Sequence, residues 1–382
     1  MRAPVLPPPG RPRVDVLIVA GEHSGDEHAA RMVREFLRLR PDGNVAAIGG
    51  PALAAAGAQL LYDLTGSSVV GIAEVAKHIG FFRRFFAATL GWIAEHRPRA
   101  VCLVDYPGMN LRLAAALRGR GLSRRGWGPI QMLYYISPQI WAWKAGRRFE
   151  LARNVDAMAV IFPFEVAAYA DTRLPVEFVG HPFAAPDFAP AVRFDPAGPV
   201  LLLPGSRRQA VRRIFPAILA GFREFGERGA VALFPSPEIE AELRRWAGSP
   251  DSGVTLRPVP RDAALGASAV LTSSGTMSMQ CALAGIPGAI AYRANAATYV
   301  LGRCLVDVPY LGIANLLLGE AMYPEYLQGA AKAHALADQL RSALHDPERR
   351  TRAQAQAERL RTLLAGSARR TAGEWLSDRL GV

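Results

Sequence analysis

The sequence predicts an α/β protein made of two Rossmann-like domains that face each other across a cleft. Two observations lead to this fold class. Short β-rich runs alternate with amphipathic stretches along the 382 residues, a pattern typical of parallel strands joined by helices. The alternation also stops at a proline-rich segment and then begins again, so the same architecture is expected twice. A chain of this length suits two domains of ordinary size.

The first half of the chain contains six β-rich runs separated by helix-like segments, and it predicts an N-terminal domain over residues 1–182. The runs are VDVLIVAG, NVAAIGG, AVCLVD, IQMLYYIS, DAMAVIF and VEFVG. Residues 182–199 hold five prolines and no periodicity, so a linker is predicted over 183–199.

The second half repeats this pattern and predicts a C-terminal domain over residues 200–365. Its β-rich runs are PVLLLPG, GAVALFP, VTLRPV, SAVLTSSG and GAIAYR. From about Ala330 the pattern is helical only. A last helix over 366–382 has no packing partner that the sequence identifies.

Composition and charge limit the function classes. The formal net charge of +12 favours anionic partners such as nucleotides, phosphorylated substrates or acidic lipid. Nucleic acid is not expected, because zinc-finger and RRM signatures are absent. Cys102, Cys281 and Cys304 lack metal-ligand spacing and indicate reduced thiols in a cytoplasmic protein. No run reaches the ~18 apolar residues of a membrane span, and the N-terminal run is too short for a signal peptide.

Two loops after strands of the first half carry polar residues and glycines. The segment GEHSGDEHAA places Gly21, Glu22 and Ser24 after the first strand. Helix capping by Ser24 or Asp26 explains part of this loop but not Glu22 or the glycines. The segment CLVDYPGMN places Asp105 at a strand end, where a carboxylate suits a general base or a simple turn.

Two loops of the second half suit phosphate binding. After LLLPGSRR, Ser206 and Arg207 combine a hydroxyl and a guanidinium with a helix start, which favours a phosphate or diphosphate. After VLTSSGTM, a second helix start carries Ser274, Gly275 and Thr276. Two such helix starts in one domain predict a nucleotide-sugar diphosphate as the ligand.

An aromatic segment, YYISPQIWAWKAGR, follows another strand of the first half. Core packing is the default for tryptophan, but Trp141 and Trp143 follow a proline turn beside Lys144 and Arg147. This arrangement is also compatible with an acceptor site.

Together these segments resemble the lipid-A-disaccharide synthases, which are glycosyltransferases of the two-domain GT-B type. The matching motifs span nearly the whole chain in the family's order: GEHSGD, DYPGMN, YYISPQIWAWKAGR, FPFE, GHP, LLPGSR, SSGTMSMQCAL, NLLLGE and PEYLQ. The resemblance implies a N-terminal acceptor domain and a C-terminal UDP-sugar domain. It also implies an enzyme that joins UDP-2,3-diacylglucosamine to 2,3-diacylglucosamine 1-phosphate by inversion, with no metal and no cofactor.

The same resemblance implies roles for individual residues. Asp105 would be the general base, with Glu22 shaping the acceptor side as the second candidate. Donor contacts would come from Ser206, Arg207, the Ser274–Thr276 helix start, Gln280 and Asn315. Further substrate contacts are expected from Gly21, Ser24, Asn110 and Trp141.

Two departures from the family pattern remove negative charge. The family usually reads Asp-x-Pro-Asp-Phe-Asn, whereas this chain has Gly108 and Met109. It also usually has a glutamate where Gln280 stands, the residue expected to hold the ribose hydroxyls. A non-catalytic or substrate-divergent paralogue therefore remains as an alternative. A UDP-sugar 2-epimerase-like isomerase is a second alternative, because it shares the GT-B-like fold and the UDP site.

A peripheral position on the inner face of the cytoplasmic membrane is the last expectation. In the helix predicted over Ile72–Glu95, Phe81, Phe85 and Trp92 form a second apolar stripe, turned away from the stripe expected to face the core. Arg83 and Arg84 flank it, which suits an anionic lipid surface. A helix buried on both faces, or a homodimer contact, is the alternative.

Overall fold

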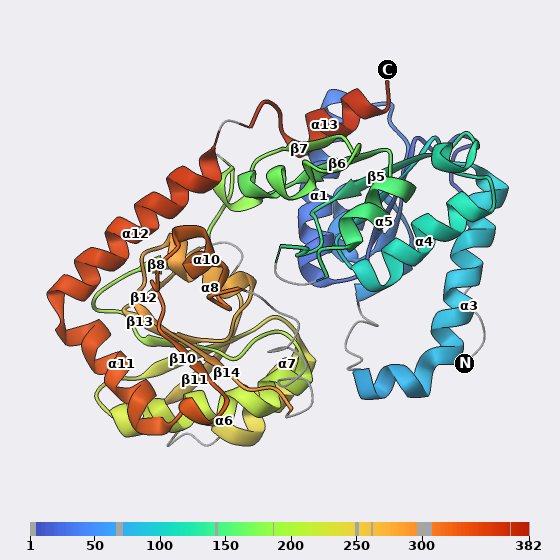
Figure 1. The fold of residues 1–382 in the computed structure, drawn as a ribbon. Helices are drawn as coiled ribbons and strands as arrows, with labels where there is room; N and C mark the ends of the chain where they lie inside the picture. The colour runs from blue at the N-terminus through green and yellow to red at the C-terminus, as the bar shows by residue number, and fades with distance from the viewer. Residues whose placement is uncertain are drawn as a thin grey trace. The chain divides into compact units, whose positions relative to one another are not determined.

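The computed structural model describes residues 5–65, 72–141, 144–185, 187–248, 252–260, 263–295, 308–366 and 368–381, with backbone only for 72–79. The chain divides into two compact units (Figure 1). Unit 1 comprises residues 1–182 and 366–382, and unit 2 comprises residues 183–365.

Unit 1 is built on a seven-stranded parallel sheet in the order β3-β2-β1-β4-β5-β6-β7. All residues of β1, β2, β4 and β5 are buried, as expected for parallel strands whose two faces are both covered. The strands are β1 (Val16–Ala20), β2 (Val45–Gly49), β3 (Gln59–Asp63), β4 (Ala100–Val104), β5 (Gln131–Tyr135), β6 (Ala157–Val160) and β7 (Val176–Phe178).

Helices connect these strands, and the C-terminal helix returns to unit 1. The helices are α1 (His23–Leu39), α2 (Pro51–Ala55), α3 (Ile72–His96), α4 (Pro107–Gly119), α5 (Arg147–Asn154) and α13 (Ala372–Arg379), with 3₁₀ turns η2 (Arg124–Gly126), η3 (Pro163–Glu165) and η4 (Ala167–Tyr169). Figure 1 shows α13 beside α1. Trp375 of α13 is fully buried, and the Gly373 N–H donates to the Glu35 carboxylate at 3.1 Å. These contacts give the last helix the packing partner that the sequence left open.

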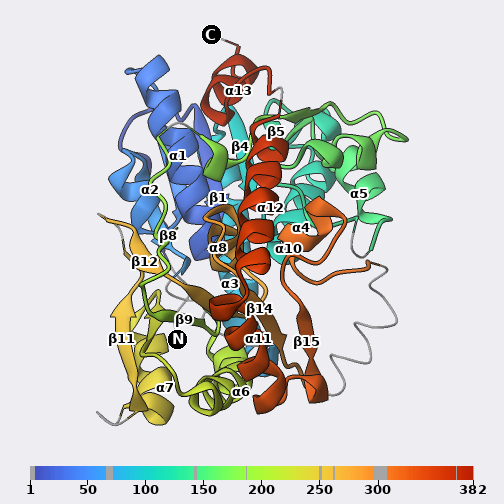
Figure 2. The ribbon, with the colours of Figure 1, turned by 90° about the vertical axis from the view of Figure 1, so that its left-hand side faces the viewer.

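Unit 2 repeats the architecture with a six-stranded sheet in the order β11-β10-β9-β13-β14-β15. Figure 2 shows β11 at one edge of this sheet and β15 at the other. The strands are β9 (Val200–Leu203), β10 (Ala230–Phe234), β11 (Val254–Pro258), β13 (Ala269–Thr272), β14 (Gly288–Tyr292) and β15 (Glu325–Leu327). The segment expected to be a linker contains β8 (Val192–Phe194), which pairs with β12 (Leu265–Ala267), so it belongs to unit 2.

The helices of unit 2 are α6 (Arg208–Phe225), α7 (Pro237–Ala247), α8 (Thr276–Leu283), α10 (Ile313–Leu318), α11 (Ala333–His345) and α12 (Pro347–Ala365), with the 3₁₀ turn η7 (Gln328–Ala330). The helices α6, α7 and α11 bury their apolar faces against this sheet, and α12 packs on α8, α10 and α11. Leucine, isoleucine and phenylalanine of α6 and α11 pack together with the buried residues of β9, β10 and β13.

The structure contradicts the membrane face predicted on α3. Phe81, Phe85 and Trp92 are only 8%, 0% and 4% exposed and lie in the core of unit 1. Trp92 Nε1–H donates to the Pro7 carbonyl at 2.8 Å, and the Phe85 ring lies 4.9 Å from that of Tyr62. The segment before β1 and the strand β3 therefore cover the stripe that a helical wheel alone leaves free.

The stripe expected to face the core comprises Val75, Ile79, Phe82, Phe86, Leu90 and Ile93. Its described side chains are packed in the core of unit 1, where Leu90 and Ile93 are buried. Phe82 and Phe86 are half-buried against the same core, while the side chains of Val75 and Ile79 lie outside the described residues. In the part of the chain that the structure describes, no helix has the length and apolar character needed to cross a bilayer.

Candidate active site

The four loops predicted from the sequence lie at the two topological switch points. In unit 1 the strand order reverses between β1 and β4, and in unit 2 it reverses between β9 and β13. Loops GEHSGD and DYPGMN follow β1 and β4, and loops GSR and SSGT follow β9 and β13. Ligands of doubly wound sheets bind at the carboxyl ends of the strands beside such a reversal. The fold therefore brings the loops together in two pairs.

The two loops of unit 1 are in direct contact. A Cβ atom on Gly21 would lie 2.2 Å from a ring carbon of Tyr106, so the Tyr106 ring packs directly on Gly21. A Cβ atom on Gly25 would lie 3.8 Å from the nearest carbon of the Val104 side chain, which is an ordinary van der Waals contact. Close packing thus explains Gly21 but not Gly25, and Gly21 as a substrate contact remains a prediction.

Asp105 stands on a strained turn. Asp105 and Tyr106 have φ values of 44° and 46°, in the left-handed region that ordinary residues rarely adopt. The Asp105 carbonyl accepts hydrogen bonds from Tyr134 Oη at 2.6 Å and from Asn110 Nδ2 at 2.8 Å. These bonds hold the turn, and backbone strain of this kind gathers at functional sites. The half-buried carboxylate of Asp105 is therefore a well-positioned candidate base.

Asn110 stabilises this loop from the protein interior. Its side chain is completely buried, and Nδ2 also lies within reach of the Val19 and Val104 carbonyls, at 3.4 and 3.2 Å. The amide nitrogen therefore fixes the ends of β1 and β4, and Asn110 as a substrate contact remains a prediction.

The GEHSGD loop divides between structural and candidate functional residues. Asp26 is 2% exposed and accepts hydrogen bonds from the N–H groups of Gly50, Ala52 and Leu53. It therefore caps α2, whereas the sequence suggested the helix that follows the loop. Glu22 is the N-cap residue of α1 without a side-chain capping bond. Glu22 and Ser24 are both half-buried at the carboxyl end of β1.

Trp141 is half-buried and meets a residue that the sequence reasoning did not select. Its Nε1–H donates to the Glu165 carboxyl group at 3.4 Å, and its ring lies 5.4 Å edge-on from Phe164. Burial raises the pKa of Glu165 to about 8, against the opposing effect of its hydrogen bonds. In the sequence, Glu165 is part of the FPFE motif, which matches the family but does not by itself indicate a role for the glutamate. Trp143 lies outside the described residues.

The two loops of unit 2 also touch each other. Gly205 has φ 109°, and a Cβ atom there would lie 3.0 Å from Ser273 Oγ. Ser206 and Arg207 are exposed beside this contact, with Arg207 as the N-cap residue of α6. The next residue, Arg208, donates to the buried Glu242 of α7.

The second helix start is equally open. Gly275 and Thr276 are exposed at the beginning of α8. Ser274 Oγ donates to the Leu311 carbonyl at 2.9 Å, which ties this turn to the loop before α10. Two helix N-termini therefore begin at neighbouring strand ends of unit 2, and each favours an anion.

Gln280 and Asn315 have partners within unit 2. Gln280 Oε1 accepts the Ala191 N–H at 3.0 Å, which connects α8 to the segment before β8. Asn315 is completely buried. Its Nδ2 donates to the Tyr323 carbonyl and the Glu325 carboxylate, and its Oδ1 accepts two backbone N–H groups. Asn315 thus orders the loop between α10 and β15 rather than presenting its amide to a ligand.

The departure at Gly108 has no backbone cause. A Cβ atom at this exposed position of α4 would meet nothing within 4 Å, so the fold accommodates a larger side chain there. Cys102 and Cys281 are buried free thiols. Among the described residues, no group of three His, Cys, Asp or Glu side chains is placed to hold a metal ion.

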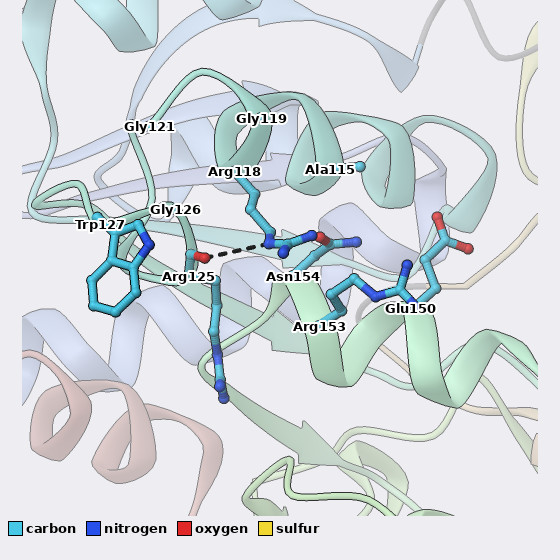
Figure 3. Close-up of a pocket in the computed structure, with 10 residues that line it drawn as sticks. All are labelled: Ala115, Arg118, Gly119, Gly121, Arg125, Gly126, Trp127, Glu150, Arg153 and Asn154. Carbon is cyan, nitrogen blue, oxygen red and sulfur yellow. Dashed lines mark hydrogen bonds between the residues drawn. The ribbon is translucent and has the colours of Figure 1, made fainter.

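A surface concavity of about 640 Å³ lies on the amino-terminal side of the unit 1 sheet, opposite the carboxyl ends of the strands (Figure 3). Its lining comes from α4, the loop before β5 and α5, and includes Arg118, Arg125, Trp127 and Arg153. These segments lie at the amino ends of β5 and β6, away from the loops described above. None of the predicted site residues lines it.

Comparison with solved structures agrees with this architecture. The forosaminyltransferase SpnP, 14% identical, is similar over 97% of this chain and 100% of its own, with a TM-score of 0.58. The UDP-GlcNAc 2-epimerase of Neisseria meningitidis, 11% identical, is similar over 96% of this chain and 99% of its own, also with a TM-score of 0.58. The predicted α/β, GT-B fold class is confirmed. Because glycosyltransferases and epimerases share this fold, the fold alone does not separate them.

Sequence comparison separates the two. A protein of Geobacter sulfurreducens named lipid-A-disaccharide synthase is 38% identical over 348 residues, which are 87% of this chain and 88% of that protein. The model of the lipid-A-disaccharide synthetase family matches residues 16–377. The resemblance seen in the motifs is confirmed, and the protein is a glycosyltransferase. The chain belongs to the lipid-A-disaccharide synthetase family.

Proposed function

We propose that the enzyme joins UDP-2,3-diacylglucosamine to 2,3-diacylglucosamine 1-phosphate, giving the lipid A disaccharide 1-phosphate and UDP. The observation that supports this best is the placement of the family's motifs at both switch points. Unit 1 contributes a strained strand-end carboxylate, and unit 2 contributes two adjacent helix starts. These are the parts that a sugar transfer from a nucleotide diphosphate needs.

In the proposed reaction the acceptor 6-hydroxyl attacks the anomeric carbon of the donor. The C–O bond to the diphosphate breaks on the opposite face, so the configuration inverts. The Asp105 carboxylate takes the hydroxyl proton, and the electron pair of the breaking bond leaves with UDP. A positioned base of this kind contributes about 10²–10⁴-fold to the rate.

Negative charge grows on the diphosphate as it leaves, and donors of unit 2 stabilise it. Arg207 supplies a charge-assisted hydrogen bond. Ser206 and Thr276 supply hydroxyl donors, and the Ser274–Thr276 turn supplies backbone donors at a helix N-terminus. Because UDP itself is the leaving group, we propose that the reaction uses no cofactor.

Both proposed substrates carry acyl chains, which supports association with the inner membrane face as part of the proposal. The contact is not the Phe81, Phe85 and Trp92 stripe, which is buried. Sedimentation with vesicles of anionic and of zwitterionic lipid tests the association. Equal absence from both vesicle pellets contradicts it.

UDP release from the diacylglucosaminyl donor, with and without the lipid acceptor, tests the proposed reaction. We expect release only when both substrates are present. Conversion of the donor without acceptor would instead indicate an isomerase. Donor binding without any conversion would indicate a non-catalytic paralogue.

A further inference from the structure

Glu165 is a buried carboxyl group that the proposed reaction does not use. The residue is 2% exposed and closes the short turn η3 after β6. Its Oε2 accepts the Phe162 N–H at 3.1 Å, and its Oε1 accepts the Trp141 indole N–H at 3.4 Å. Burying a carboxyl group costs free energy that an apolar side chain of similar size avoids. We therefore look for the function of this carboxyl group in the two groups that donate hydrogen bonds to its oxygens, the Phe162 N–H and the Trp141 indole.

The carboxyl group supports a row of aromatic rings. Trp141 meets Phe164 edge-on at 5.4 Å, Phe164 stacks on Phe162 at 5.6 Å, and Phe162 lies 5.1 Å from His181. These rings follow β5, β6 and β7 in the chain. They therefore lie at the carboxyl ends of the strands, on the same side of the sheet as Asp105, which follows β4.

The row is partly open to solvent. Phe164 is 38% exposed and Trp141 is half-buried, whereas Phe162 and His181 are buried beneath them. Exposed aromatic rings offer apolar faces that pack against the C–H groups of a sugar ring. A rigid ring binds better than a mobile one, because less conformational entropy is lost on binding.

The electrostatics distinguish Glu165 from Asp105. Burial, with a smaller contribution from the negative charge of Asp105, raises the pKa of Glu165 to about 8. Tyr169, whose own pKa is raised by burial and by the charge of Glu165, also lies close to it. At neutral pH Glu165 therefore keeps its proton. It does not compete with Asp105 for the acceptor proton, and its oxygens remain available to Trp141.

We propose that Glu165 is a positioning residue: it holds the Trp141 indole against Phe164, so that the two rings form a wall for the acceptor sugar. The identity of that sugar rests on the proposed function. The contact between Glu165 and Trp141 does not, so the two ideas fail separately.

Steady-state kinetics test the wall with four variants. Glu165→Ala removes the oxygens, and we expect it to raise the KM for the lipid acceptor about tenfold while the KM for the donor stays unchanged. Glu165→Gln keeps an acceptor oxygen and is expected to stay within about threefold of wild type. Trp141→Phe is expected to behave as Glu165→Ala does. Glu150→Ala, on α5, is the control and should change neither KM.

The double variant provides the decisive comparison. If Glu165 acts through Trp141, combining Glu165→Ala with Trp141→Phe should raise the acceptor KM no further than either change alone. Effects that multiply would overturn the proposal. Should Glu165→Ala fail to fold, Trp141→Phe decides alone, and an unchanged acceptor KM in that variant overturns the proposal.

Fluorine NMR tests the contact without activity. The chain has six tryptophans, and after labelling with 5-fluorotryptophan the Trp141 resonance is identified by its loss in Trp141→Phe. We expect Glu165→Ala to shift this resonance by more than the linewidth, and Glu165→Gln to shift it less. An unshifted resonance in Glu165→Ala would overturn the proposal. If the Trp141 resonance shifts as expected in Glu165→Ala but the wild-type protein transfers no sugar, the proposed function fails and the positioning contact stands.

Discussion

The cleanest perturbation of the proposed base is Asp105→Asn, because the backbone at this position is left-handed. Asp105 has φ 44°, and asparagine is among the few residues that tolerate such a value. Alanine there adds about 1–2 kcal/mol of backbone strain. The two bonds that hold the turn, from Tyr134 and Asn110, go to the Asp105 carbonyl. They survive the exchange, so the asparagine variant isolates the loss of the proton acceptor.

We expect Asp105→Asn to lower kcat by about 10²–10⁴-fold, which corresponds to about 2.7–5.4 kcal/mol of transition-state stabilisation. UDP affinity should stay within a factor of about two, because the proposed diphosphate contacts lie in unit 2. The melting temperature should also stay close to that of wild type. Asp105→Ala should lose both activity and stability.

Turnover is measured as UDP release at saturating donor and acceptor, and UDP affinity by calorimetry. The two readings separate chemistry from binding. Normal turnover of Asp105→Asn would refute the assignment, and Glu22, at the end of the neighbouring strand β1, would become the candidate base.

Three further predictions concern binding and pH. Arg207→Ala should weaken UDP binding at least tenfold, since a hydrogen bond to a charged group is worth about 1.5–3 kcal/mol. The control Arg213→Ala, on the exposed side of α6, should change UDP binding little, and equal effects of the two variants would indicate a diffuse basic surface. Gln280→Glu should tighten UDP-sugar binding by about 1–2 kcal/mol, because a carboxylate forms charge-assisted hydrogen bonds with the ribose hydroxyls. The melting temperature of the free protein should not change. Weaker binding would mean that the proposed ribose site serves another donor. The pKa of Glu165 is raised from 4.5 to about 8 by burial, so the stability it contributes is complete below about pH 4.5 and is lost as the pH rises towards 8. Between pH 5 and 8, the free energy of unfolding of wild type should therefore fall relative to that of Glu165→Gln by up to about 1.4 kcal/mol per pH unit. If thermal denaturation shows the same dependence of stability on pH for both proteins, this carboxyl group does not titrate as expected.

The sequence predicts the central strands because each is a continuous apolar run between turn residues. It does not reveal β8, β12 and β15, which have three residues each, or β3, in which only Leu61 is buried. The strand β7 is equally short, but the apolar Val179 extends its run. Nor does a strand list give the strand order. The order places the loops at the switch points, and only the structure shows that Gly21 packs on Tyr106.

Side-chain roles are harder to predict than the positions of motifs. A helical wheel shows that α3 has two apolar stripes, but it does not show that Pro7 and Tyr62 cover the second one. Asn315 lies in a motif that suggested a donor contact, yet its four hydrogen bonds are all internal. Such roles depend on contacts between segments far apart in the chain, and no local pattern records them.

The structure of the reaction product tests the central claim most directly. With labelled donor and lipid acceptor, we expect NMR and mass spectrometry to show a β-1,6-linked disaccharide 1-phosphate, formed in equal amount to UDP. A donor isomerised at C2, an α-linked product, or UDP released without any disaccharide would contradict the account.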